Sequence, residues 1–255
     1  MYTLVYDGTM AGLLTCIFSV YEHKYAQVSI RKATSNLRDA FATEINIENN
    51  REQAARVWKG LQKKLSPGAL REFYFCFLSE LHGIENTLLE YAKYVFATNG
   101  NIEDDYGNKY VLEVSQIARK VGREKHRMEA FVRFKLLKDK IFYAAIEPDF
   151  NVLPVILPHF KKRYADQHWL IYDLKRKYGI YYNKDTEIVD EVVLKWADGV
   201  QAGNDNEAFE PDEPMYQLLW RSYFNSTNIK ERKNVKLHIQ HVPRRYWKYL
   251  TEKQI

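Results

Sequence analysis

The sequence contains very little cysteine. Cys16 and Cys76 are the only two among 255 residues, and no CxxC pair occurs. This scarcity excludes a disulfide framework and a Cys-rich zinc or iron–sulfur site within this chain. Both cysteines lie in apolar segments with helical spacing, so we expect them to be buried free thiols.

Long apolar runs and targeting signals are also missing. No run of about 18 apolar residues is present, as a membrane-spanning helix would need. The opening "MYTLVYDGTMAGLLTCIF" lacks the basic start of a signal peptide. Hydrophobic residues make up 46% and charged residues 28% of the chain, which is ordinary for a globular protein. We therefore expect a cytoplasmic protein with one large domain or two small ones.

Common catalytic and nucleotide-binding motifs are absent. The sequence has no GxGxxG, GxxxxGK, HExxH or nucleophile elbow. His159 and His168 lie nine residues apart without a short metal motif, so no metal site is expected. Glu147 and Asp149 follow an expected strand, where paired carboxylates can share a proton, although Pro148 and Asp149 are also ordinary turn residues. The residues alone do not establish an enzyme.

The net charge of +5 is unevenly distributed. Residues 186–213 contain nine acidic residues and one basic residue, whereas residues 230–249 contain seven basic residues and one acidic residue. Separated basic regions are typical of chains that meet a polyanion. The alternative is that the basic regions serve solubility and pair with the acidic segment.

Three clusters combine basic and aromatic residues: "HFKKRY" (159–164), "KRKYGIYY" (175–182) and "PRRYWKYL" (243–250). Cations neutralise phosphates and rings stack on bases, so such clusters are typical of nucleic-acid surfaces. Rings facing the core of an amphipathic element are the alternative. The candidate nucleic-acid contacts are Lys162, Arg163, Tyr164, Lys175, Arg176, Tyr178, Arg244, Arg245, Trp247 and Lys248.

The periodicity predicts an α+β fold. Its first half has strands at 2–6 and 26–33, a helix from residue 10, helices over 48–98 with a break near Gly83, and a helix over 110–127. Ser66 and Pro67 are a helix start signal. The second half reads as strands around a "KDK" turn within 128–149, a helix over 154–166 that Pro158 restricts, and a hairpin over 167–183. We expect these two hairpins to form an antiparallel sheet with the helix on one face.

The remainder is expected to be helical around one loop. Residues 186–199 are read as a helix, 199–214 as an exposed loop, and the tail as two helices. Pro243 must kink or split the second of these tail helices.

Several stretches together resemble a bacterial family described as probable DNA metabolism proteins, a domain of unknown function. They are "YDGTMAGLLTCIFSVYEHK", "RVWKGLQKKLS", "HRMEAFVRF", "IEPDFNVLPVILPHFKKRYADQHWLIYDLKRKYGIYY" and "HVPRRYWKYL". The resemblance covers nearly the whole chain, which suggests one family domain, 1–255, that allows a subdivision into 1–125 and 126–255. The matching positions are Pro148, Asp149, His159, Phe160, Arg163, Trp169, Asp173, Tyr246 and Trp247.

The resemblance implies a role in DNA repair or modification. Members of the family lie beside a radical-SAM protein, and a similar region is fused to uracil-DNA-glycosylase-like domains. It implies a DNA-binding or accessory protein with a radical-SAM partner. S-adenosylmethionine and the iron–sulfur cluster are expected only in that partner, because this chain has no CxxxCxxC.

Two other functions are kept open. One is an enzyme acting directly on damaged DNA or nucleotide, with a pocket formed by His126, Glu147, Asp149, His159 and Asp173. The other is a protein-interaction scaffold, in which the acidic segment 186–213 docks a basic partner.

Overall fold

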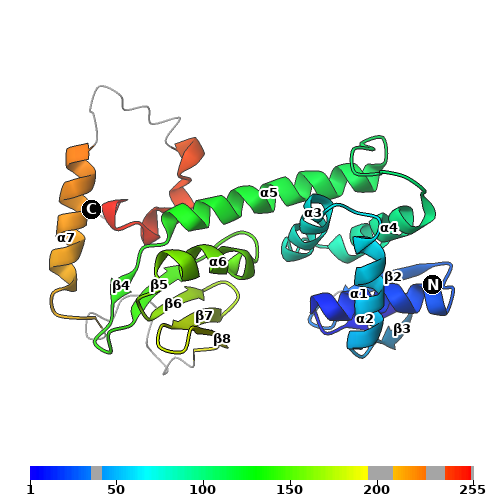
Figure 1. Ribbon diagram of the computed structural model, residues 1–255, viewed down its shortest axis with the longest axis horizontal. Coiled ribbons are helices and arrows are strands. Elements are labelled where there is room, and N and C mark those ends of the chain that lie inside the picture. Colours follow the sequence, from blue (N-terminus) through cyan, green and yellow to red (C-terminus); the bar gives the residue numbers. More distant parts are fainter. Residues whose placement is uncertain (36–41, 195–208, 228–238, 254–255) are drawn as a thin grey trace. The chain divides into compact units, whose positions relative to one another are not determined.

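The structure is a computed structural model that describes residues 1–35, 42–194, 209–227 and 239–253 (Figure 1). The chain divides into two compact units, Met1–Gly122 and Arg123–Ile255, and the boundary falls within helix α5 (Lys109–Phe131). Helices and two separate sheets are both present, so the expected α+β class is confirmed.

The first unit contains a three-stranded parallel sheet. Its strands are β1 (Tyr2–Tyr6), β2 (Val28–Lys32) and β3 (Thr43–Asn46), in the order β2-β1-β3. The middle strand has four consecutive buried residues, as expected for a parallel strand covered on both faces. Helix α1 (Met10–Glu22) links β1 to β2. Sequence reasoning missed β3, because its four residues are mostly exposed and show no apolar alternation.

The helices of this unit begin and end close to the predicted points. They are α2 (Arg51–Gln62), α3 (Pro67–Leu78), α4 (Ile84–Ala97) and the first part of α5. The Ser66 hydroxyl accepts a hydrogen bond from the Ala69 N–H at 3.2 Å, which confirms the helix start. The break before α4 lies at Gly83, whose φ is +79°, a conformation that favours glycine.

Both cysteines are buried free thiols, as predicted. Cys16 lies on α1 and Cys76 on α3. Burial raises the pKa of the Cys16 thiol to about 12 and raises the pKa of Cys76 as well. Since the thiolate is the reactive form, neither cysteine is suited to nucleophilic or redox chemistry.

The second unit contains a five-stranded mixed sheet in the order β4-β5-β6-β7-β8. Its strands are β4 (Lys135–Leu136), β5 (Phe142–Ile146), β6 (Trp169–Asp173), β7 (Tyr178–Asn183) and β8 (Ile188–Val192). Both predicted hairpins, β4/β5 and β6/β7, are present. The expectation of antiparallel pairing throughout is wrong at one junction. Helix α6 (Leu153–Arg163) forms a crossover, and β6 pairs parallel to β5.

Three other segments differ from expectation. Helix α5 continues to Phe131, so the strand predicted from residue 128 shrinks to the two residues of β4. Residues 188–192 form strand β8 and not the predicted helix, because they pair with β7. Pro158 lies inside α6 and does not set its start.

The described part of the tail agrees more closely with the prediction. Helix α7 spans Glu213–Thr227, and after Pro243 the chain forms two 3₁₀ helices, η2 (Arg244–Tyr249) and η3 (Thr251–Lys253). Most of the predicted loop over 199–214 and the basic residues Lys230, Arg232, Lys233 and Lys236 lie outside the described residues.

Aromatic rings form much of the core of the second unit. Phe160 of α6 and Trp169 of β6 are at most 2% exposed, and their rings lie 6.2 Å apart. Phe134 contacts both of them and also Tyr164. The high Tyr and Phe content is therefore explained in part by packing. Over the described residues, no helix is long and apolar enough to cross a membrane.

Candidate nucleic-acid interface

The loop between β5 and α6 is fixed by the 3₁₀ helix η2. The Glu147 carboxylate accepts hydrogen bonds from Lys248 Nζ at 2.5 Å and from the Tyr249 hydroxyl at 2.7 Å. These two bonds hold the pKa of Glu147 below its usual value. Glu147 is therefore ionised and paired at neutral pH.

The same loop is also tied to α5. Asp149 forms an ion pair with Arg245 (Oδ2 to Nη2, 2.6 Å), and its backbone N–H donates to Glu124 Oε1 at 2.9 Å. The Glu124 side chain is 1% exposed and also accepts a hydrogen bond from the Tyr246 hydroxyl. Sequence reasoning missed Glu124, because no local signal distinguishes it from the other charged residues of α5.

Asp173 holds the turn of the second hairpin. Its Oδ1 accepts from the backbone N–H groups of Lys175 at 2.9 Å and Arg176 at 3.1 Å, while its Oδ2 pairs with Arg176 Nη1 at 2.9 Å. Asp173 is completely buried. The Arg176 guanidinium also donates to the carbonyls of Pro148 and Asp149, both at 3.2 Å, so it links the hairpin turn to the loop.

The predicted catalytic candidates therefore do not form one pocket. Glu147 and Asp149 lie in the loop after β5, and Asp173 lies at the end of β6. Each of the three carboxylates forms an ion pair with a cation. His126 is exposed on α5, and His159 on α6 lines a separate cavity. In the described part of the chain, no group of three or more His, Cys, Asp and Glu residues is arranged to hold a metal ion.

The predicted nucleic-acid contacts also divide into engaged and available groups. Arg176, Arg245 and Lys248 pair with carboxylates, and the Tyr178 hydroxyl donates to Asn151 at 2.5 Å. The ring of Trp247 has cations 5.8 Å and 5.6 Å away, from Arg244 and Lys253. Four of the predicted cations form no ion pair with any described residue: Lys162, Arg163, Lys175 and Arg244.

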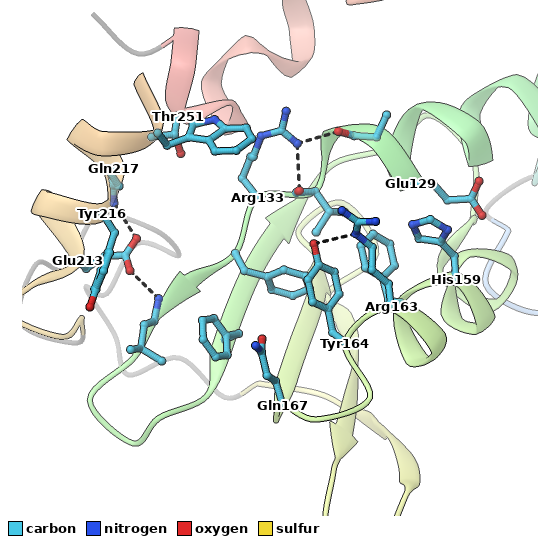
Figure 2. Close-up of a pocket in the computed structure, with 17 residues that line it drawn as sticks. Glu129, Arg133, His159, Arg163, Tyr164, Gln167, Glu213, Tyr216, Gln217 and Thr251 are labelled. Carbon is cyan, nitrogen blue, oxygen red and sulfur yellow. Dashed lines mark hydrogen bonds between the residues drawn. The ribbon is translucent and has the colours of Figure 1, made fainter. Parts of the chain in front are cut away.

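Two of these four cations lie on α6, which forms one wall of a large cavity. The cavity has a volume of about 720 Å³, which falls within the usual range of ligand sites. His159, Lys162 and Arg163 share one face of α6, because they are spaced at i, i+3 and i+4. His159 and Arg163 line the cavity together with Tyr164, whose hydroxyl accepts from Arg163 Nε at 3.3 Å (Figure 2).

The opposite wall comes from α7 and carries residues that sequence reasoning did not select. Figure 2 shows Glu213, Tyr216 and Gln217 on this wall. Trp220 also lines the cavity, with its ring 5.4 Å from the Arg133 guanidinium. The sequence predicts "MYQLLW" only as part of a helix, because the proximity of its rings to α6 depends on the tertiary fold.

Comparison with known families shows which family the chain belongs to. A family model described as a domain of unknown function (DUF4130) matches residues 82–252, which is more than half of the chain. The chain belongs to this family. The DUF4130 match includes the α6 face, the loop after β5 and the tail segment through η2. No curated protein matches.

Solved structures give only weak likenesses to this DUF4130 protein. A pGpG-specific phosphodiesterase, PggH from Vibrio cholerae, aligns with a TM-score of 0.34 and 11% identity over 71% of this chain and 80% of that chain. A DHH-domain member of the S1p family of ribosomal proteins aligns with a TM-score of 0.23 and 12% identity, over 72% and 57% of the two chains. At these scores neither likeness bears on function.

Proposed function

We propose that the second unit, Arg123–Ile255, binds single-stranded nucleic acid along the exposed face of α6. The observation that carries this proposal is the pair of cations Lys162 and Arg163, which have no carboxylate partner among the described residues and lie beside an aromatic cavity. Cations next to stacking rings are the combination that single-stranded nucleic-acid sites use. The family resemblance favours DNA as the nucleic acid.

Helix α6 differs from the other basic clusters in having two adjacent cations without an ion pair to a described residue, one of which lines the cavity. Arg245 and Lys248 already neutralise Asp149 and Glu147, so a phosphate would have to compete with those carboxylates. Lys162 and Arg163 can meet phosphates without breaking an ion pair of the described structure. Lys175 and Arg244 are available in the same sense and are assigned secondary contacts.

The first prediction concerns the double substitution Lys162→Gln and Arg163→Gln. Removing one phosphate interaction with a single strand lowers the slope of log K against log salt by about 0.7, so the slope of the double variant is expected to fall by about 1.4. The affinity for oligodeoxynucleotides at low salt falls with it. Fluorescence anisotropy of a labelled single strand, titrated over a series of salt concentrations, measures both quantities.

A matched control removes the same charge elsewhere in the unit. Lys138→Gln with Lys184→Gln changes two exposed lysines that do not line the cavity. This control is expected to keep the wild-type slope to within experimental error. Equal losses in both double variants, or a wild-type affinity that does not depend on salt, would contradict the assignment to α6.

We also propose that this protein acts as an accessory subunit of a radical-SAM protein in DNA repair or modification. The support is the family resemblance carried by "PHFKKRYADQHWLIYD" and "RYWK". The second prediction is that the two proteins co-purify when a tagged copy of this chain is expressed with the radical-SAM protein that the resemblance implies as its partner. Absence of co-purification at both low and high salt would contradict the proposed partnership. It would not bear on nucleic-acid binding by this chain, which the salt titration tests.

A further inference from the structure

We propose that the cavity beside α6 receives one unstacked nucleobase that carries an exocyclic amino group. This proposal rests on the nucleic-acid binding proposed above and names the part of the strand that the unit holds most tightly. The ring positions, the polar groups and the volume of the cavity support it.

The first support is the set of aromatic walls. Six of the lining residues are aromatic: Phe134, Phe142, Phe160, Tyr164, Tyr216 and Trp220. Phe134 is fixed edge-to-face against Phe160 and Tyr164, with centroids 5.8 Å and 5.3 Å away. Tyr216 and Trp220 are 52% and 40% exposed, so parts of both side chains remain open to a ligand. Every nucleobase has a flat face that can stack on such rings.

The second support is a carboxylate that holds one wall in position. Glu252 accepts from Arg133 Nη2 (Oε1, 2.7 Å) and from Trp220 Nε1 (Oε2, 2.9 Å), and Arg133 in turn lies over the Trp220 ring. Burial raises the pKa of Glu252, but hydrogen bonds from Arg133, its own backbone and Trp220 outweigh burial and lower it. The indole is therefore fixed before a ligand arrives, which reduces the ordering cost of stacking.

The third support is the polar group at the α7 wall. Glu213 is 5% exposed, and its two carboxylate oxygens accept one bond each, from the Leu136 N–H at 2.9 Å and from Gln217 Nε2 at 3.2 Å. A carboxylate oxygen can accept more than one hydrogen bond. Carboxylates in nucleic-acid sites accept from exocyclic amino groups such as that of cytosine. Glu213 therefore favours an amino-bearing base over thymine or uracil.

The volume of the cavity and the cations of α6 fit a base that lies inside the cavity while its phosphate stays outside. The cavity of about 720 Å³ is larger than many sites for small ligands. Arg163 lines the cavity on α6, the element that also carries Lys162. A strand whose phosphates meet α6 would thus place one base between Tyr164, the residue that follows α6, and Trp220 of α7.

The third prediction tests this base site with strands that offer only one base. Three single strands of about 12 nucleotides are compared, a length within the usual footprint. All nucleotides are abasic except the central one, which carries cytosine in the first strand, uracil in the second and no base in the third. The full chain is expected to bind the cytosine strand at least about fivefold more tightly than the fully abasic strand, the lower end of a stacking contribution. It is expected to prefer cytosine to uracil severalfold.

Four variants assign the effect to the cavity. Trp220→Ala is expected to abolish the gain from the base while leaving binding of the abasic strand unchanged, whereas Trp220→Phe keeps a ring and most of the gain. Glu213→Gln should remove the preference for cytosine. Circular dichroism and abasic-strand binding show whether each variant is folded, and Tyr216→Ala gives a second test of the same wall.

The outcomes separate this inference from the proposed function. Equal binding of the one-base and abasic strands, with normal salt dependence, would overturn the base site and leave phosphate binding on α6 intact. Failure to bind any strand, including an ordinary cytosine-containing oligonucleotide, would overturn both. A gain from the base that survives both Trp220→Ala and Tyr216→Ala would also overturn the assignment to this cavity.

Discussion

Asp173→Ala is expected to destabilise the second unit by about 3–5 kcal/mol, the usual cost of breaking a buried ion pair by removing one partner. Asp173 is fully buried, and the Arg176 side chain is 10% exposed. The substitution would remove the carboxylate opposite the Arg176 guanidinium and the acceptor of two backbone N–H groups. Hydrogen exchange of the β6 and β7 amides, followed by mass spectrometry, reports the loss in this unit separately from the first.

Two comparisons make this result specific. Asp173→Asn keeps an oxygen acceptor for the turn but removes the charge opposite Arg176, so an intermediate loss is expected. Asp166 is an exposed aspartate of the same unit. Its replacement by alanine should change stability by no more than about 0.5 kcal/mol. If Asp173→Ala were as stable as Asp166→Ala, Asp173 would not be structural and would again be a candidate for chemistry.

The sequence was sufficient where the deciding interactions are local. Ser66 and Pro67 mark the start of α3, and the segment "KDK" marks the turn between β4 and β5. The direction of β6 and the existence of β8 depend on which strands they pair with, and periodicity within one segment carries no information about that. The predictions of an antiparallel sheet throughout and of a helix over 186–199 were therefore wrong: β5 and β6 pair in parallel, and residues 188–192 form a strand.

The same distinction applies to the candidate site. The basic–aromatic clusters can be recognised in the sequence, but the ion pairs between their cations and distant carboxylates cannot. Asp149 and Arg245 lie far apart in the sequence and form an ion pair of 2.6 Å. Only the tertiary fold shows that the cations of η2 meet the carboxylates of the loop after β5. It also shows that Lys162 and Arg163 of α6 have no such partner among the described residues.

Several residues of the stretches that carry the family resemblance form one connected arrangement. Pro148 and Asp149 of the loop meet Arg176 of the hairpin turn and Arg245 of η2, while Asp173 fixes Arg176. A charged residue in a recognisable motif can thus serve the architecture. These connected residues fix the loop that precedes α6, whereas Arg163, which is also a motif residue, is exposed on α6 and belongs to the proposed phosphate contacts.

Glu124→Leu is the second substitution for which we expect a large loss, again about 3–5 kcal/mol for the second unit. The change would leave the Asp149 N–H and the Tyr246 hydroxyl without their buried acceptor, and would remove the charge opposite Arg127 and Arg245. Since Tyr246 is 2% exposed, its hydroxyl cannot turn to water without moving η2. Hydrogen exchange of β5 and β6 amides measures the loss.

A double-mutant cycle separates the hydrogen bond from helix propensity. Tyr246→Phe alone should cost about 1.5–3 kcal/mol, the usual range for a hydrogen bond to a charged group. Glu124→Leu should cost less in the Tyr246→Phe background, because one of its buried partners is already gone. Glu113→Leu changes an exposed position of the same helix, so it is the control and should be nearly neutral. Strict additivity of the two changes would mean that Glu124 and Tyr246 do not act together. The contacts between η2 and the loop would then be the Arg245 and Lys248 ion pairs and the Tyr249 hydrogen bond.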